Sequence, residues 1–233
     1  MITIDSKQIG LESLQKKYQN AIIADVTYTA KNYLVRLCPS FPHGGIPVPN
    51  SGFTTANSVE AIWQGLKIFE SEDIDTSLFS KENANELIRS SSQLGKMLGH
   101  RFGINGLEVL NYADARRRIF IRTYRWVLDY KVQDIIKWLR DATKSQTIVL
   151  LDNHINCDIY NYNEPLSHAY LVRAYVEGLP PYEDAFETIT THHYYAGRRV
   201  ISWTTEERRV KTIKSCIMPQ QLELSLDFKG EIL

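Results

Sequence analysis

The chain has few cysteines, no long apolar run and no net charge, and each of these shortages excludes a class of protein. The three cysteines, Cys38, Cys157 and Cys216, are widely spaced without a Cys-x-x-Cys pair, which argues against a disulfide framework and favours a reducing compartment. No stretch approaches the roughly 20 apolar residues of a membrane span, and MITIDSKQ lacks the pattern of a signal peptide. We therefore expect an intracellular, cytoplasmic protein with no membrane partner.

Common nucleotide-binding signals are also missing. The sequence contains no Walker loop, no GxGxxG and no internal repeat. Its 27 Lys and Arg residues balance 27 Asp and Glu residues, so no global field draws the protein to nucleic acid. A chain of 233 residues is nevertheless long enough to bury a sizeable core and to enclose a pocket.

Hydrophobic periodicity predicts a mixture of helices and strands. Helical spacing covers positions 6–18, 81–89, 91–98, 112–143 with an interruption near 119–123, and 164–177. Strand patterns cover positions 21–28, 33–37, 146–151, 199–204 and 222–228. The most apolar strand, QTIVLL, leads directly into a polar loop.

The most informative stretch is 43–69, a Gly/Pro-rich loop followed by a helical pattern. One helical face is apolar and predicts core contacts: Val59, Ile62, Leu66 and Phe69. The opposite face carries four candidate ligand contacts: Glu60, Trp63, Gln64 and Lys67. An indole beside an acid, an amide and an amine suits a ligand with a flat ring and polar substituents. The alternative is a capping box, in which Glu60 only reaches back to the amide of Asn57.

The loop before this helix contributes His43, Gly44 and Gly45 as further candidates. The glycines allow close approach of the backbone to a ligand, and prolines on both sides stiffen the loop. The alternative is a rigid surface connection in which His43 bonds a neighbouring carbonyl group.

Arginines form a second candidate site. The sequence ARRRIFIRTYRW places Arg116, Arg117, Arg118, Arg122 and Arg125 among aromatic residues. Guanidinium groups bind phosphate bidentately and aromatic rings stack on bases, so this combination is typical of a phosphate-tracking groove. It is equally typical of a solvated helix face. Arg101, just past the predicted helix 91–98, either supplies an anion contact or complements the helix dipole.

Polar residues after the buried strand form the third candidate site. Asp152, Asn156 and Asp158 lie in DNHINCDIYN, where a strand fixes position and a loop gives access. The alternative is local turn chemistry, in which Asn and Asp bond their own backbone. Metal binding is not predicted, because the acids and histidines here match no recognised spacing. Adjacent Ser167 and His168 would not face each other on a helix, so they are not predicted to be a nucleophile and its base.

Several of these segments resemble the NADAR family of N-glycosidases, which is associated with riboflavin biosynthesis and ADP-ribose. In NSVEAIWQGLKIFES, Glu60, Gln64, Lys67 and Phe69 occupy or adjoin the family pattern T/S-x-E-x-x-x-Q-x-x-K-F. Three more segments follow in the family's order: SSQLGKMLGHRFG, RIFIRTYRWVLDYKVQDIIKWLRDA and IVLLDNHINCDIYN. HGGIPVP, WQGLK and PLSHAYLV are similar to a group of uncharacterised bacterial proteins, a remote branch. The resemblance covers roughly positions 37–162.

The resemblance implies an α+β fold, mainly helical, in a single domain at 1–180 with a small β-sheet. Positions 181–233 would be a β-containing extension packed on that domain. It also implies hydrolysis of an N-glycosidic bond between a ribose-type sugar and a base. We expect no cofactor. Alanine stands at position 61 in place of the family's histidine, and Tyr160-Asn161 replaces its Trp-Gly, which leaves the substrate open.

In that chemistry Glu60 is the first choice for the carboxylate near the anomeric carbon, with Asp152 or Asp158 as a second acid. The remaining candidates would contact the base, sugar or phosphate: Trp63, Gln64, Lys67, Arg101, Asn156, Tyr160, His43, Gly44 and Gly45. The substrate would be a free nucleotide, an ADP-ribosylated base or a modified base in phage DNA, the last in antiviral defence. The competing classes are a nucleotide-binding module without turnover and a structural interaction protein. The sequence does not indicate an oligomeric state.

Overall fold

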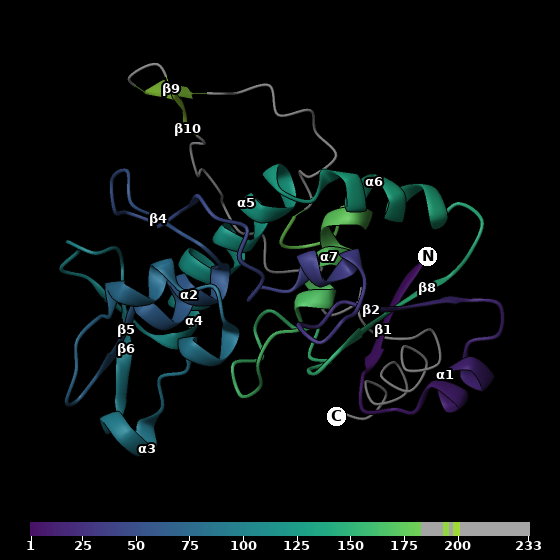
Figure 1. The fold of residues 1–233 in the computed structure, drawn as a ribbon, viewed down its shortest axis with the longest axis horizontal. Coiled ribbons are helices and arrows are strands. Elements are labelled where there is room, and N and C mark those ends of the chain that lie inside the picture. The colour runs from purple at the N-terminus through teal and green to yellow at the C-terminus, as the bar shows by residue number, and fades with distance from the viewer. Residues whose placement is uncertain (183–192, 196–197, 201–233) are drawn as a thin grey trace, which may run out of the picture.

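The strand that leads into the polar loop organises the fold. The computed structural model describes residues 1–182, 193–195 and 198–200. Strand β8 (Ile148–Asp152) is buried throughout and lies in the middle of a parallel sheet, between β1 (Ile2–Ser6) and β2 (Ile22–Asp25) (Figure 1). The sequence predicted this strand, and its position at the centre of the sheet explains why it is continuously apolar.

Both faces of β8 are covered, and its alternating side chains pack into two different clusters. Ile148 and Leu150 join the main hydrophobic core, whereas Val149 and Leu151 pack with Leu14 of α1 (Leu11–Lys17) in a smaller cluster on the other face. Since strand side chains repeat with period two, Asp152 extends from the same face as Ile148 and Leu150.

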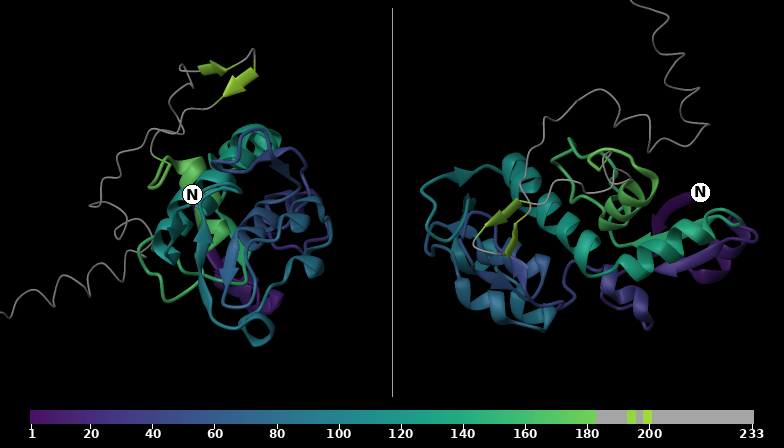
Figure 2. Two further views of the ribbon diagram at one scale, coloured as in Figure 1. Left: turned by 90° about the vertical axis from the view of Figure 1, so that its left-hand side faces the viewer. Right: turned by 90° about the horizontal axis from the view of Figure 1, so that it is seen from above.

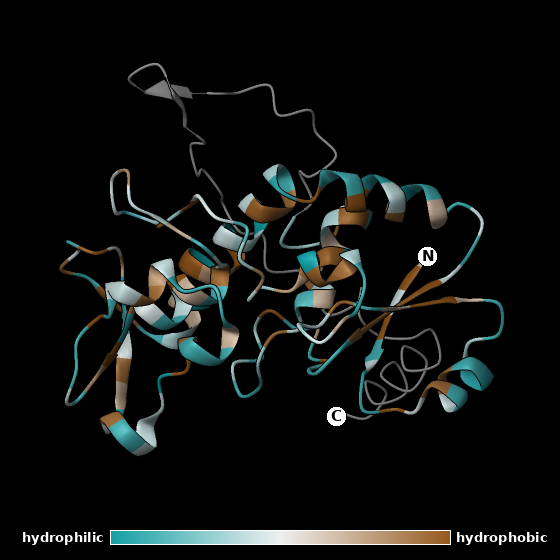
Figure 3. Cartoon of the chain, viewed as in Figure 1, coloured by the Kyte–Doolittle hydropathy of each residue, from teal (hydrophilic) through white to brown (hydrophobic). Residues whose placement is uncertain are grey.

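Helices cover the main-core face of this sheet. Helix α7 (His168–Glu177) packs against β1 and β8, and α5 (Arg122–Tyr130) and α6 (Gln133–Ala142) pack against α7 (Figure 2). Figure 3 shows hydrophobic residues along much of the parallel strands, whereas α6 has separate hydrophobic and hydrophilic faces. Ile135 and Leu139 of α6 are buried, and Trp138 packs partly buried against the core.

A second group of elements lies beside the sheet and its helices. It contains α2 (Val59–Gly65) and an antiparallel sheet of β5 (Lys67–Phe69), β6 (Met97–Arg101) and β7 (Val109–Leu110). The small pair β3 (Ile46–Pro47) and β4 (Thr55–Ala56) precedes α2. Short helical turns connect these elements: η1 (Tyr33–Leu37), η2 (Thr76–Ser80), η3 (Ala84–Leu87) and α3 (Ser91–Leu94).

The core positions of α2 are as predicted, but the helix is shorter. Its apolar stripe is buried, yet the helix ends at Gly65 and the chain continues as strand β5. A Cβ on Gly65 would lie 2.5 Å from a ring carbon of Phe79, so η2 packs directly against the backbone at this helix end. The predicted strand at 33–37 is wrong. It is the 3-10 helix η1, because the side chain of Asn32 caps Leu34 and the chain buries Leu34 and Leu37, three residues apart.

The long helical segment is divided more than predicted. It begins with α4 (Tyr112–Ala115), widens into the π-helix η4 (Arg116–Ile121) and continues as α5, and α6 begins only after a break at Lys131. The helix predicted for 164–177 starts later, at His168, where Ser167 caps it. Of the two strands predicted near the end, the first partly coincides with β10 (Arg198–Val200), which pairs with β9 (His193–Tyr195). Positions 201–204 and 222–228 lie outside the described residues.

The architecture is α+β, as predicted. Most of the expected extension at 181–233 lies outside the described residues. Within the part of the chain that is described, no helix is both long and apolar enough to cross a bilayer.

Candidate functional site

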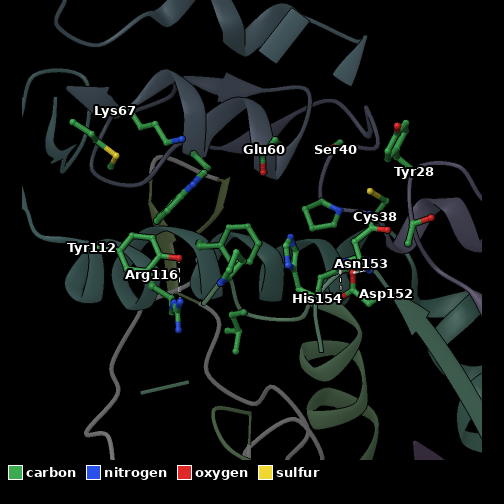
Figure 4. Close-up of a pocket in the computed structure, with 18 residues that line it drawn as sticks. Tyr28, Cys38, Ser40, Glu60, Lys67, Tyr112, Arg116, Asp152, Asn153 and His154 are labelled. Carbon is green, nitrogen blue, oxygen red and sulfur yellow. Dashed lines mark hydrogen bonds and ion pairs between the residues drawn. The ribbon is translucent and has the colours of Figure 1, made fainter. Parts of the chain in front are cut away.

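A cavity of about 430 Å³ opens at the carboxyl end of β8. Figure 4 shows Glu60 and Lys67 on one wall, with Tyr112, Arg116 and Asp152 on the other. Trp63 also lines it. The cavity therefore brings together predicted residues from three segments that are distant in sequence. Ligand sites of α/β proteins commonly lie beyond the carboxyl ends of parallel strands, which is where this cavity lies.

Glu60 is held by its neighbours on α2 and not by the helix N-terminus. The hydroxyl of Ser58 caps Ala61, and the backbone amide of Asn57 donates to the carbonyl of Phe79 and not to Glu60, so the alternative capping box is absent. The Nε2 of Gln64 donates to Glu60 Oε1 at 2.6 Å. Among the described residues, the second carboxylate oxygen of Glu60 has no hydrogen-bond partner.

Gln64 links Glu60 to Lys67 without lining the cavity itself. Its Oε1 accepts a hydrogen bond of 2.8 Å from Lys67 Nζ, so the two bonds fix which end of the amide faces which charge. Burial lowers the pKa of Lys67, although the charge of Glu60 acts in the opposite direction. Lys67 is thus a half-buried cation at the cavity wall whose partner is an amide.

Trp63 is surrounded by aromatic rings. Its ring centroid lies 3.8 Å from that of His100, 5.9 Å from that of Tyr112 and 5.7 Å from that of Phe120. Tyr112 and Phe120 make edge contacts at interplanar angles of 72° and 75°. The indole is therefore positioned by three elements, α4, η4 and β6.

Asp152 is saturated by hydrogen bonds. Its Oδ2 accepts from the Ser167 hydroxyl at 2.7 Å, from the Ala169 amide at 3.2 Å and lies 3.0 Å from His168 Nδ1. Its Oδ1 accepts from the Asn153 amide at 2.7 Å. The residue is 2 % exposed. A carboxylate with four donors is held in its charged form and is poorly suited to take up a proton.

His168 completes a buried ion pair with Asp152. Its second nitrogen, Nε2, faces the carbonyl of Val26 at 2.9 Å, so both ring nitrogens face acceptors and both carry protons. Burial opposes the charged imidazole, but the carboxylate of Asp152 outweighs it and raises the pKa of His168. Burial likewise opposes the charge on Asp152, but His168 and the other donors hold the pKa of Asp152 well below its usual range. The ion pair of Asp152 and His168 therefore lies at one end of the cavity, and its hydrogen bonds hold both side chains in place.

Arg116 is a buried cation on the far wall. It is 2 % exposed and donates to the carbonyls of Asn161 at 2.7 Å and Glu164 at 2.6 Å, and to the hydroxyl of Tyr112 at 3.0 Å. Within the described part of the chain it has no acidic partner. Its charge is therefore balanced by carbonyl and hydroxyl groups and not by a carboxylate.

Four of the five arginines predicted to track phosphate groups lie outside the cavity lining. Arg117 pairs with Asp114, Arg118 pairs with Glu108, and Arg125 pairs with Asp129, while Arg122 lies half-buried outside the cavity lining. The π-helix η4 has more residues per turn than an α-helix, so the arginines do not keep the ordinary helical spacing that the prediction assumed. Of the five, only Arg116 contributes to the cavity lining.

Other predicted contacts in the polar loop have structural roles. Asp158 accepts from the amide of Tyr160, and the Asn156 side chain bonds the carbonyls of Asn161 and Glu164 and the amide of Asp158. Tyr160 packs against the main core. This is the alternative turn chemistry, and none of these three residues lines the cavity.

Candidates from the glycine loop and from β6 also lie outside the cavity lining. His43 bonds the carbonyl of Arg36, and burial lowers the pKa of its ring to about 4. Gly44 and Gly45 adopt positive φ angles of 70° and 67°, which explains the glycines by backbone conformation. The Nη2 of Arg101 donates to both carboxylate oxygens of Asp73, at 2.7 and 2.6 Å.

A model of one protein family matches residues 6–172, and that family, DUF6939, is described as a family of unknown function. The chain belongs to the DUF6939 family. No curated protein matches the chain. The DUF6939 match contains all 18 residues that line the cavity, so the site lies entirely within the family region.

Sequence reasoning missed several lining residues of the DUF6939 domain. They are Thr27, Tyr28, Cys38, Pro39, Ser40, Met97, Tyr112, Phe120, Asn153, His154, Pro165, Leu166 and His168. Most come from short segments without a motif. Thr27 and Tyr28 follow β2, so their position at the carboxyl edge of the sheet was the available signal. Burial raises the pKa of the Cys38 thiol to about 11, so this residue is a protonated wall group and not a nucleophile.

Proposed function

We propose that the cavity binds a nucleotide-like small molecule and hydrolyses its N-glycosidic bond, with Glu60 as the acting carboxylate. The observation that carries this proposal is the contrast between the two lining acids. Asp152 is saturated by donors and paired with His168, whereas one oxygen of Glu60 is without a hydrogen-bond partner among the described residues. Of these two acids, only Glu60 therefore has a carboxylate oxygen that can contact a ligand.

The proposed reaction suits a carboxylate at this place. Cleavage of an N-glycosidic bond develops positive charge on the anomeric carbon, and a nearby carboxylate stabilises that charge or accepts a proton from the attacking water. The water oxygen bonds to the anomeric carbon, the carbon–nitrogen bond breaks, and the departing base keeps the electron pair and takes a proton. Glu60 receives one proton of the water and passes it to the departing base, while the other proton stays on the new hydroxyl group of the sugar. The hydrogen bond from Gln64 keeps Oε1 of Glu60 in place during the transfer.

The other walls suit the remaining parts of such a ligand. Trp63 offers an aromatic surface for a base, and Lys67 and Arg116 are cations without a carboxylate bonded to them among the described residues. A phosphate group held near them would place the sugar beside Glu60, between the cations and the Asp152–His168 pair. A small ligand is favoured over DNA, because three of the other four arginines of the run are paired with acids and none lines the cavity.

The test is base release by the wild type and by Glu60→Gln. The wild type is incubated with nucleotides, ADP-ribose, ADP-ribosylated DNA and modified phage DNA, and mass spectrometry detects a free base. Glu60→Gln should reduce release by about 10²–10⁴-fold while ligand affinity changes little. Glu12→Gln is the matched control, since Glu12 lies in the first turn of α1 but is exposed and remote from the cavity lining. Equal turnover in Glu60→Gln and wild type contradicts the proposed role.

One observation favours a second candidate, a nucleotide-binding module without turnover. Glycosidic hydrolysis commonly uses two carboxyl groups, and here Asp152 is committed to its ion pair. A binding module predicts saturable binding of a nucleotide, no base release from any substrate of the panel, and unchanged affinity in Glu60→Gln.

A further inference from the structure

His100 lies directly behind the cavity wall in an environment unusual for histidine. It is 0 % exposed and sits on β6 opposite Lys67 of β5. Its ring covers Trp63 with 3.8 Å between centroids and 36° between planes. Both ring nitrogens are buried, and neither has a hydrogen-bond partner among the residues that the structure describes.

A histidine usually acts through a charge, a proton or a hydrogen bond, and His100 has none of these available. Burial lowers the pKa of its ring to about 3, and the neighbouring charge of Lys67 acts in the same direction. The ring is therefore neutral at ordinary pH. It does not line the cavity, so it does not touch a ligand there. What remains is its flat face, which lies against the indole.

We propose that His100 is a positioning residue that holds the indole of Trp63 as a fixed, uncharged stacking platform for one planar ring of the ligand. His100 covers one face of the indole, and edge contacts from Tyr112 and Phe120 restrict its rotation. Because Trp63 lines the cavity, the proposal places a ligand ring against the face of the indole that His100 does not cover. The nucleotide-like identity of the ligand rests on the proposed function, whereas the platform requires only a flat ring.

The variants His100→Leu and His100→Phe distinguish the effect of a flat ring against Trp63 from the effect of any apolar side chain that fills the same space. His100→Leu keeps an apolar side chain behind Trp63 but loses the flat face, and His100→Phe keeps the face without the nitrogens. Binding is measured by calorimetry with AMP and nicotinamide mononucleotide, which carry a ring, and with ribose 5-phosphate, which does not. Acrylamide quenching of Trp63 fluorescence, taken as the difference from Trp63→Phe, reports how firmly the indole is held.

His100→Leu should weaken binding of the ring-bearing probes by about three- to tenfold, the range of an aromatic contact, and leave ribose 5-phosphate unaffected. It should also make Trp63 more accessible to the quencher. His100→Phe should restore ring binding and protection of Trp63, and should unfold at a denaturant concentration no lower than the wild type, because two unpaired buried nitrogens are removed.

Two results would overturn the proposal. The first is an affinity of His100→Leu for the ring-bearing probes equal to that of the wild type. The second is a loss of this affinity in His100→Phe as large as in His100→Leu, because the ring nitrogens and not the flat face would then be responsible. Ring binding without base release would refute the proposed hydrolysis and leave the role of His100 standing. A wild type that binds no ring-bearing probe would refute both.

Discussion

Replacing Asp152 by asparagine should destabilise the DUF6939 domain strongly, because the side chain is the centre of a buried network. Three donors converge on Oδ2 and one on Oδ1. An amide presents one acceptor atom and one donor atom, so in either orientation the introduced side chain would turn its NH₂ group toward at least one donor of the network. The charge that stabilises the protonated form of His168 would also disappear.

The size of the effect follows from the burial of both partners. Breaking a buried ion pair by removing one charge costs about 3–5 kcal/mol, because the remaining charge is left without compensation. With a urea dependence of about 2 kcal/mol per molar, the unfolding midpoint should fall by about 1.5–2.5 M. Asp141→Asn, which removes an exposed partner of Lys144, is the control and should leave the midpoint unchanged.

The loss of stability in Asp152→Asn should depend on pH in a defined direction. The pKa of His168 in the folded state lies above its ordinary value of 6.5. Its contribution to the free energy of unfolding is therefore complete below pH 6.5 and disappears as the pH rises through the folded pKa. The pKa of Asp152 in the folded state lies below its ordinary value of 3.8. Its contribution to the free energy of unfolding is therefore complete above pH 3.8 and disappears as the pH falls through the folded pKa.

Urea unfolding followed by circular dichroism at pH 5.5 and pH 9 tests this reasoning. The difference between wild type and Asp152→Asn should be larger at pH 5.5, within the window between the two ordinary pKa values. A loss below about 1 kcal/mol, or the same loss at both pH values, would refute the buried ion pair, because only a charged pair brings both the size and the pH dependence.

Three further predictions concern α2. Ser58→Ala should lower the free energy of unfolding by about 1 kcal/mol in urea titrations, because the N-cap bond to Ala61 is lost. Gly65→Ala should lower it by about 1–3 kcal/mol, because the added methyl group would lie 2.5 Å from Phe79 and force the packing apart. Gln64→Leu should leave the fold stable but reduce kcat by about tenfold or more in the base-release assay, with KM little changed, because Glu60 loses the donor that orients it.

Each of these three predictions has a control substitution. Ser92→Ala, at an exposed serine of α3, should not change the unfolding midpoint, and Gly10→Ala should be tolerated because no atom lies within 4 Å of the added carbon. Gln64→Glu keeps the shape of the side chain but places a like charge beside Glu60, so any activity should shift to a different pH optimum. A Gln64→Leu variant with wild-type kcat would show that Glu60 needs no orienting bond.

The sequence was informative where a pattern had a single physical solution. The continuous apolar run QTIVLL predicted a buried strand, and β8 is buried throughout. The face of α2 with Glu60 and Trp63 was also visible from helical periodicity, and both residues line the cavity.

Other features depended on contacts that local patterns do not contain. The alternation at 33–37 predicted a strand, but burial of Leu34 and Leu37 requires a turn, which Asn32 caps. The arginine run was read at ordinary helical spacing, whereas the π-helix η4 changes that spacing, and Asp114 and Glu108 pair with two of its arginines. His168 was set aside because it does not face Ser167 directly, yet the structure orients both toward Asp152.

The order of strands in the parallel sheet has a consequence for synthesis of the chain. β1 and β2 emerge first, but they are not neighbours in the sheet, and each pairs with β8. A nascent chain that stops before Ile148 therefore carries two strands whose hydrogen-bonding edges have no partner, and it cannot yet form the end of the sheet that bears Asp152. Fragments cut between β2 and β8 should need to be co-expressed to recover a folded protein, since neither piece contains a complete sheet.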